Sequence, residues 1–92
     1  MLMAHADVLR QRTIAVDPGH GGPDPGAKGG GLVEKNLVLD IALRLEALLK
    51  QAGAEPLLTR SDDDQFTDGT PITESKREEL SHRAEIANQA NA

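Results

Sequence analysis

The segment TIAVDPGHGG, residues 13–22, joins a short apolar run to a glycine-rich stretch, and a long amphipathic segment begins further on at Glu34. The β-branched residues of the run and the Pro-Gly pair that follows predict a buried strand over 13–16. The end of that strand delivers His20, and the start of the next helix brings a carboxylate to the same rim. Imidazole and carboxylate together suit Zn²⁺, so the pattern predicts a metal site formed by His20 and Glu34.

Each of these two residues also has a simpler interpretation. A histidine between glycines can be a loop residue that tolerates an unusual backbone, and a glutamate at a helix start is a favourable charge on the helix dipole. The second interpretation is compatible with a ligand role, because a carboxylate at a helix start is oriented and kept ionised. We favour the ligand interpretation for His20 and Glu34, since metal sites combine clustered histidines and acidic residues.

Residues 34–52 carry apolar side chains at helical spacing and predict an amphipathic helix packed on a sheet. Gly53 is placed to end this helix. A second short apolar run over 56–59 predicts another strand, and the strand–helix–strand order predicts a parallel βαβ unit with a right-handed crossover. The predicted packing stripe consists of Val38, Ile41, Leu45 and Leu48, widened by Ala42, Leu49 and Ala52.

The C-terminal part predicts a loop and a second helix. Residues 62–75 are polar and predict a surface loop, in which the aspartates of 62–64 form a solvated turn. Ser75 with Glu78 three residues later matches a capping box and predicts a helix start. The chain is therefore expected to be an α/β protein, an open sheet with a parallel βαβ unit plus a second helix. The side of the last helix toward the sheet is expected to hold Leu80, Ala84, Ala87 and Asn91, with His82 on the surface.

Composition and charge argue against several classes of protein. The formal net charge is −5 and no basic stripe is present, which argues against a nucleic-acid partner. The glycine-rich segment 19–31 lacks the Gly-Lys-Ser/Thr of a Walker loop and the GxGxxG of a dinucleotide loop. The chain has no cysteine, so a metal must use histidine and carboxylate, and no apolar stretch approaches the length of a membrane span. Residues 1–12 lack the features of a signal peptide and are expected to form a tail.

Several motifs in order resemble one enzyme family. DPGHGG at 17–22 is followed by an acidic residue and a Gly-Ala pair, by GLVEK at 31–35, by Thr-Arg at 59–60, and by LSHRAEIAN at 80–88. This order resembles the zinc-dependent N-acetylmuramoyl-L-alanine amidases of type 3, most of all the catalytic domains of spore-cortex and cell-separation amidases. The resemblance covers residues 13–92 and implies the N-terminal part of the amidase catalytic domain, a truncated three-layer α/β/α domain.

The resemblance implies zinc-dependent hydrolysis of the amide bond between N-acetylmuramic acid and L-alanine in peptidoglycan, with Zn²⁺ as cofactor and His20 and Glu34 as two of its ligands. In the family a second histidine ligand and a catalytic glutamate come later, so this chain is expected to hold no catalytic residue and to be inactive alone. The expected partners are peptidoglycan and either a missing C-terminal half or a second copy, in an extracellular, periplasmic or cell-wall location. The alternative is a non-catalytic remnant with a wall-binding or scaffolding role.

Four further residues have expected supporting roles. Asp17 is expected to accept the other ring N–H of His20 and fix its tautomer, or else to cap the turn after the strand. Asp24 is the second candidate for this role, but Asp17 lies nearer in the sequence, and Asp24 is expected instead to close an Asx turn before Pro25. Arg60 and Arg83, which match positions of the amidase pattern, are expected to be structural and to bind carboxylates or backbone carbonyls near the sheet edge.

Overall fold

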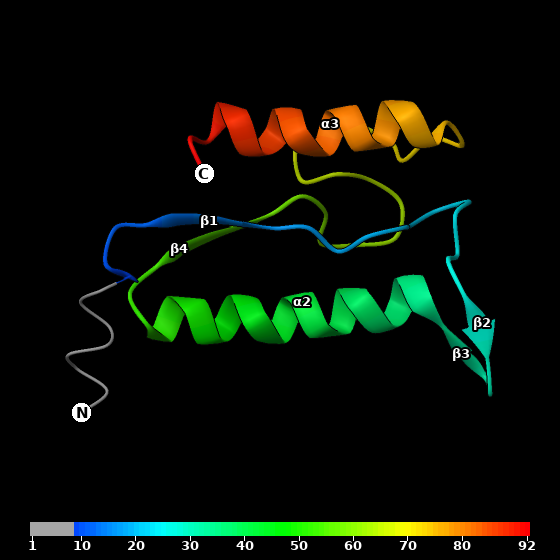
Figure 1. The fold of residues 1–92 in the computed structure, drawn as a ribbon, viewed down its shortest axis with the longest axis horizontal. Helices are drawn as coiled ribbons and strands as arrows, with labels where there is room; N and C mark the ends of the chain where they lie inside the picture. Colours follow the sequence, from blue (N-terminus) through cyan, green and yellow to red (C-terminus); the bar gives the residue numbers. More distant parts are fainter. Residues whose placement is uncertain (1–8) are drawn as a thin grey trace.

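The computed structural model describes residues 9–92, so most of the expected tail over 1–12 lies outside the described part (Figure 1). Two long helices and four short strands make up this part, and none of its helices is long and apolar enough to cross a bilayer. In chain order the elements are β1 (Thr13–Val16), β2 (Lys28–Gly29), β3 (Leu32–Val33), α2 (Glu34–Gln51), β4 (Glu55–Leu58) and α3 (Lys76–Gln89).

Strands β1 and β4 form a parallel pair in register from Thr13 opposite Glu55 to Val16 opposite Leu58. Helix α2 lies along one face of the pair and α3 along the other, which gives three layers (Figure 1). Adjacent residues of a strand point to opposite faces, so Leu58 packs with Ala42 of α2 while Leu57 packs on the α3 side. The predicted α/β class and parallel βαβ unit are therefore confirmed.

Helix α2 begins at Glu34, as predicted, and ends in a Schellman motif. Gly53 has φ +88°, its N–H donates to the carbonyl of Lys50, and the N–H of Ala54 donates to the carbonyl of Leu49. The predicted packing stripe is only partly right. Ala42 is buried and Leu49 packs against its cluster, whereas three other members of the stripe stay exposed: Ile41 at 53%, Leu45 at 41% and Leu48 at 61%.

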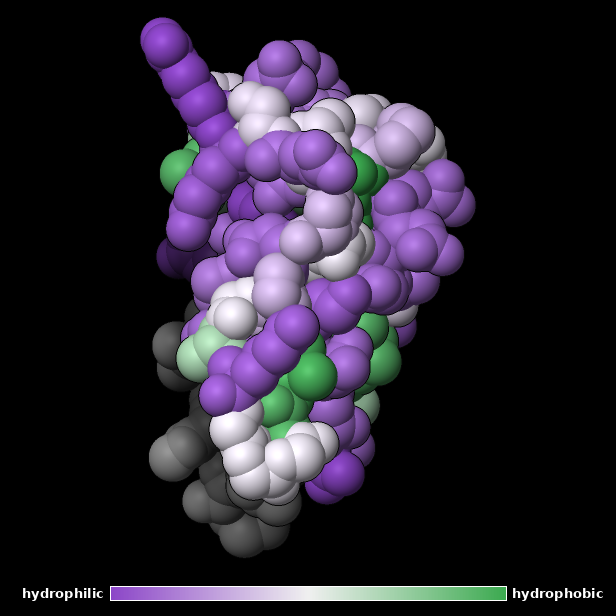
Figure 2. Space-filling model, turned by 90° about the vertical axis from the view of Figure 1, so that its right-hand side faces the viewer, coloured by the Kyte–Doolittle hydropathy of each residue, from purple (hydrophilic) through white to green (hydrophobic). Residues whose placement is uncertain are grey.

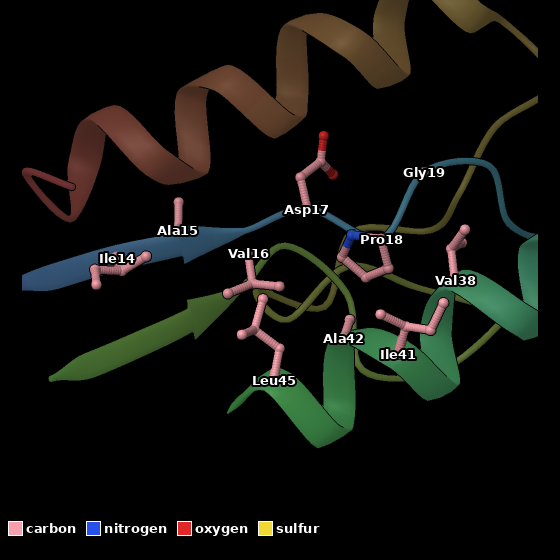
Figure 3. Close-up of a pocket in the computed structure, with 10 residues that line it drawn as sticks. All are labelled: Ile14, Ala15, Val16, Asp17, Pro18, Gly19, Val38, Ile41, Ala42 and Leu45. Atoms are coloured by element: carbon pink, nitrogen blue, oxygen red, sulfur yellow. The ribbon is translucent and has the colours of Figure 1, made fainter. Parts of the chain in front are cut away.

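The position of α2 explains this difference. The helix packs against β4, and the strand pair is too narrow to cover the rest of its apolar surface. Two of the exposed side chains, Ile41 and Leu45, line a cavity of about 410 Å³ together with β1 (Figure 3). Figure 3 shows Val16 pointing toward Ala42 and Leu45 in this cavity, while Ala15 and Asp17 point toward α3.

The segment between β4 and α3 contributes a second apolar cluster, so the expectation of a plain surface loop over 62–75 is wrong. Phe66 is 2% exposed and Ile72 is 9% exposed, and they pack with Ile86 of α3. Isolated bridges join Arg60 to Phe66 and Gln65 to Pro71. Leu57 of β4 packs against this cluster, so the loop helps to cover the α3 side of the sheet.

Helix α3 starts as predicted, since the Ser75 hydroxyl accepts the N–H of Glu78 at 3.4 Å. The side that it turns toward the sheet differs from the predicted one. Glu79, Arg83 and Ile86 are buried, whereas Leu80 is 57% exposed. Arg83 determines this orientation, because its guanidinium reaches polar acceptors beyond the end of β1.

The glycine-rich loop contains a small hairpin that was not predicted. Strands β2 and β3 pair in antiparallel fashion, Lys28 with Val33 and Gly29 with Leu32. The two residues between them, Gly30 and Gly31, have φ of +55° and +78°, as a tight two-residue turn requires. The hairpin leads directly into α2 and so fixes where its first residue lies.

Candidate metal centre

His20 and Glu34 meet at the rim of the sheet. The Nε2 atom of His20 lies 3.2 Å from Oε1 of Glu34, with the two side chains 25% and 40% exposed. One residue comes from the loop after β1 and the other is the first residue of α2. The structure therefore brings together the two residues that the sequence predicted as metal ligands, and their role as ligands remains a prediction.

The backbone at His20 has φ +63°, in the left-handed region that few non-glycine residues adopt. Such a conformation costs on the order of 1–3 kcal/mol and persists only where surrounding contacts hold it. In this conformation the two ring nitrogens of His20 lie next to carboxylate oxygens, Nδ1 next to Asp24 and Nε2 next to Glu34.

Asp24, rather than Asp17, holds the histidine ring. The Nδ1 atom of His20 lies 2.9 Å from Oδ2 of Asp24, and the other Asp24 oxygen accepts the N–H of Gly26 at 3.1 Å, which is the expected Asx turn. The hydrogen bond with His20, and then that from Gly26, lowers the pKa of Asp24, so this carboxylate stays ionised.

The prediction that Asp17 orients His20 is therefore wrong. Oδ1 of Asp17 accepts hydrogen bonds from the Thr59 hydroxyl at 2.7 Å and from Arg83 at 2.6 Å. The alternation of side chains along β1 explains this, because it directs Asp17 toward α3 (Figure 3). His20, three residues later, contacts Asp24 and Glu34 instead.

Gly26 leaves the room that the two side chains occupy. A Cβ atom at this position would lie 2.5 Å from Oε1 of Glu34 and 2.8 Å from Cδ2 of His20, and the residue has φ +66°. Oε1 of Glu34 also accepts the N–H of Ala27 at 2.9 Å, which fixes the carboxylate from the same loop. The loop thus forms a close-fitting cradle around both groups.

The charges around the imidazole favour a cation. Both ring nitrogens of His20 face carboxylate oxygens, and a neutral imidazole carries only one N–H to share between them. A positive charge between Nε2 and the Glu34 oxygen, a proton or a metal ion, therefore satisfies the pair. Ligands of a tetrahedral zinc ion lie roughly 3.3–3.6 Å apart for bonds of about 2.0–2.2 Å, slightly farther than the observed 3.2 Å.

These residues fit a zinc ion as part of a larger ligand set. Within residues 9–92 no group of three or more histidine, cysteine or acidic side chains is placed to hold a metal. A structural zinc site uses four protein ligands and a catalytic one uses three. His20 and Glu34 can therefore supply two ligands, and the remainder must come from outside the described residues.

Two buried arginines hold the loop that carries His20, as expected for structural residues. Arg60 donates to the carbonyls of Pro18, Gly19 and His20, and Arg83 donates to those of Pro18 and His20. Burial lowers the pKa of Arg60 from its usual value, which is far above neutrality. The guanidinium groups replace water as partners for three successive carbonyls.

Lys35 and Asp63 form a further tie that the sequence did not reveal. The Lys35 ammonium donates to the carbonyl of Gly22 at 2.8 Å and to Asp63 at 2.9 Å, and the N–H of Gly22 donates back to Asp63. Burial opposes ionisation of Asp63, but the hydrogen bonds from Lys35 and Gly22 outweigh it and lower its pKa. The expectation that 62–64 form only a solvated turn is wrong at this residue.

His82 is less exposed than predicted. Its side chain is 20% exposed, its Nε2 lies 2.8 Å from Oδ2 of Asp68, and its ring centroid lies 4.8 Å from that of Phe66. The loop before α3 folds over the helix and covers a position that helical spacing alone places in solvent. The contacts of His82 are structural ones within the second apolar cluster.

Comparison with known proteins identifies the family to which this chain belongs. The sequence profile of the family described as N-acetylmuramoyl-L-alanine amidase matches residues 14–92. The chain belongs to this amidase family. The match includes His20, Glu34 and the loop between them, as well as both arginines.

Relatives and solved structures agree with the amidase assignment. The germination-specific N-acetylmuramoyl-L-alanine amidase of Bacillus subtilis is 42% identical over 86 residues, which cover 91% of this chain and 36% of that protein. The amidase AmiC2 of Nostoc punctiforme superposes with a TM-score of 0.69 at 40% identity, over 88% of this chain and 39% of that one. An amidase from Clostridium difficile 630 has a TM-score of 0.67 at 36% identity, over 90% and 40%. The chain thus spans well under half the length of these amidases.

Proposed function

We propose that this chain supplies two zinc ligands, His20 and Glu34, to an amidase centre that hydrolyses the bond between N-acetylmuramic acid and L-alanine in peptidoglycan. The observation that carries the proposal is the 3.2 Å approach of His20 Nε2 to Glu34 Oε1, in a chain of the amidase family. The substrate follows from the names of the relatives, and the metal follows from the donor set.

The chain's own residues orient these donors. Asp24 accepts a hydrogen bond from Nδ1 of His20 and thereby leaves Nε2 to face Glu34. Ala27 donates its N–H to the Glu34 oxygen on that side. When bound, zinc lowers the pKa of a coordinated water and polarises the scissile carbonyl. A third ligand and a proton-accepting base are needed in addition, so the chain alone is expected to be inactive.

The exposed apolar surface supports the need for a further part. Strand β1 pairs with β4 on one side only, and its free side borders the 410 Å³ cavity lined by Ile14, Val16, Ile41 and Leu45. On the face nearest the hairpin, hydrophobic patches lie mostly toward the α2 side, among hydrophilic atoms (Figure 2). Apolar surface beside an unpaired strand favours association. We assign it to the rest of an amidase domain or, without it, to a second copy.

A location outside the cytoplasmic membrane, in the periplasm or at the cell wall, follows from the proposed substrate. The alternative function, a non-catalytic wall-binding remnant, has in its favour that the described residues bring only two ligands together. The two functions differ in one observable, which is whether these two side chains are required for hydrolysis when the remainder of the domain is present.

A chimera separates them. The matching 86 residues of the Bacillus subtilis relative are replaced by this chain, and release of stem peptide from purified muropeptides is followed by chromatography with and without a chelator. We expect zinc-dependent hydrolysis that His20→Ala or Glu34→Ala abolishes, whereas His82→Ala retains it. Circular dichroism confirms that each chimera is folded. Hydrolysis that survives both ligand substitutions would contradict the proposal, and a folded chimera without activity would favour the remnant.

A further inference from the structure

The side chain of Arg60 is fully buried at the end of β4, with 0% exposure. Its Nε donates to the carbonyls of Pro18 and His20, each at 3.0 Å, and Nη1 donates to that of Asp62 at 3.0 Å. Nη2 donates to the carbonyls of Gly19 at 2.9 Å and Lys35 at 3.0 Å. All five acceptors are main-chain oxygens, so the guanidinium acts as a connector between backbone segments.

Two of these acceptors are chain neighbours of the proposed ligands. Gly19 precedes His20 and Lys35 follows Glu34, and a single nitrogen, Nη2, bonds to both carbonyls. We propose that Arg60 is the positioning residue that sets the spacing between His20 and Glu34. The proposal concerns the geometry of the pair, and its meaning for metal binding rests on the proposed function.

The chemistry of the connection requires a guanidinium. Its planar fork presents five N–H groups in fixed directions, whereas an ammonium has three donors on a flexible stem and cannot span the same acceptors. The backbone also makes room for it, because a Cβ on Gly21 would lie 2.9 Å from Nε of Arg60, at a residue with φ +126°. The left-handed backbone at His20 is then held by two guanidinium bonds to its carbonyl, one from each arginine.

Arg83 provides a matched comparison. It is also buried, at 5% exposure, and it donates to Asp17, to the carbonyl of Pro18 at 2.8 Å and to that of His20 at 2.6 Å. Within the described residues its hydrogen bonds all go to the segment after β1, and none reaches α2. Loss of Arg83 should therefore loosen the loop, while loss of Arg60 should also remove the link between the Gly19 carbonyl and the helix that carries Glu34.

The first test needs no variant. In the isotope-labelled chain, scalar couplings across hydrogen bonds report which carbonyl carbons accept from Arg60 Nη2. We expect couplings to the carbonyl carbons of both Gly19 and Lys35, together with a nuclear Overhauser contact between the His20 ring and the Glu34 side chain. Absence of the coupling to Lys35 would overturn the proposal, whatever the chain does with metal.

The second test compares Arg60→Lys with Arg83→Lys. Zinc affinity is measured by competition with a chromophoric chelator, and unfolding by urea gives the stability of each variant. Loss of groups that support metal ligands lowers affinity by about 10–100-fold, and we expect at least about tenfold for Arg60→Lys. For Arg83→Lys we expect a clearly smaller loss of affinity at a comparable loss of stability.

The outcomes separate the two proposals. Two results would show that Arg60 is only a stabilising residue. One is that Arg60→Lys and Arg83→Lys lose the same zinc affinity for the same loss of stability. The other is that Arg60→Lys folds and retains both the contact between His20 and Glu34 and the zinc affinity. If the chimera that carries the unsubstituted chain binds no zinc, the proposed function fails, and the ring contact in Arg60→Lys, measured without metal, still decides the positioning role. If Arg60→Lys does not fold, the coupling measurement on the unsubstituted chain decides it.

Discussion

Replacement of Gly26 by alanine tests the cradle around the proposed ligands. The new Cβ would lie 2.5 Å from Oε1 and 3.0 Å from Cβ of Glu34, and 2.8 Å from Cδ2 of His20. These atoms belong to the groups whose positions matter, so relief of the overlap must move His20 or Glu34. A left-handed conformation costs a non-glycine residue roughly 1–2 kcal/mol, and forced overlap in a packed site costs about 1–3 kcal/mol more.

Two other glycines separate these contributions. Gly30 has φ +55° and nothing within 4 Å of an added Cβ, so Gly30→Ala isolates the backbone cost. Gly29 also has open space, and its φ lies outside the left-handed region, so Gly29→Ala should change stability by less than about 0.5 kcal/mol. Urea unfolding followed by circular dichroism gives the three values, and zinc titration gives the effect on the centre.

We expect Gly26→Ala to be the least stable of the three and to lose zinc affinity, while Gly30→Ala loses stability and retains affinity. The reasoning would be refuted if Gly26→Ala matched Gly30→Ala in both measurements. That result would mean that the loop relaxes without disturbing His20 and Glu34, and that the observed closeness has no consequence for the pair.

Three further expectations concern charge and association. Burial raises the pKa of Glu79 above its usual 4.5, so its ionised form opposes folding. Glu79→Gln should therefore raise the unfolding temperature at pH 7, and this gain should fade as the pH falls toward 4.5 and be absent below it. The pKa of Asp63 is lowered from its usual 3.8, so Asp63→Asn should reduce the stability of the fold at pH 7, and this difference should disappear as the pH falls below 3.8. A stability difference that does not change with pH, for either Glu79→Gln or Asp63→Asn, would contradict the environments assigned to these residues. Light scattering after size-exclusion chromatography should show self-association or heterogeneity, and Leu48→Glu should reduce it; a stable, monodisperse monomer would show that the apolar side of α2 needs no cover.

Much of the fold could be predicted from sequence, because it depends on local patterns. The apolar run over 13–16 became β1 with the predicted bounds, and β4 lies one residue before the predicted 56–59. Helix α2 begins at Glu34 and Gly53 ends it, since capping chemistry involves neighbours in the chain. The Gly-Gly pair at 30–31 was a signal for the hairpin, but strands of two residues are too short for periodicity to reveal.

The features that could not be predicted depend on the width of the sheet and on contacts between residues distant in the sequence. Helical spacing gives the apolar side of α2, but which part of it is covered depends on the number of strands beneath it. Phe66 and Ile72 are isolated in a polar segment, and only the folded loop shows that they pack together. The side of α3 that is buried is the one that carries Arg83, which donates a hydrogen bond to Asp17. These two residues lie 66 positions apart in the chain.

The same distinction holds for the centre. His20 and Glu34 could be predicted as a pair because the strand end and the helix start lie at one rim. Which of Asp17 and Asp24 accepts the hydrogen bond from the His20 ring could not be predicted. Proximity in the sequence favoured Asp17, but the strand directs that side chain toward α3. Asp24 reaches the ring because of the left-handed turn at His20, and a backbone conformation of that kind leaves no mark on composition or spacing.

Calorimetric titration of Zn²⁺ into the purified chain tests the central claim most directly. His20 and Glu34 are expected to bind one zinc ion far more weakly than a site with three protein ligands does. His20→Ala and Glu34→Ala should each abolish the binding heat. The sequence has two other histidines, His5 and His82, and His5→Ala and His82→Ala should preserve the binding heat. Zinc binding that is unchanged by both ligand substitutions, or that is lost with His5 or His82 instead, would contradict the assignment of the centre.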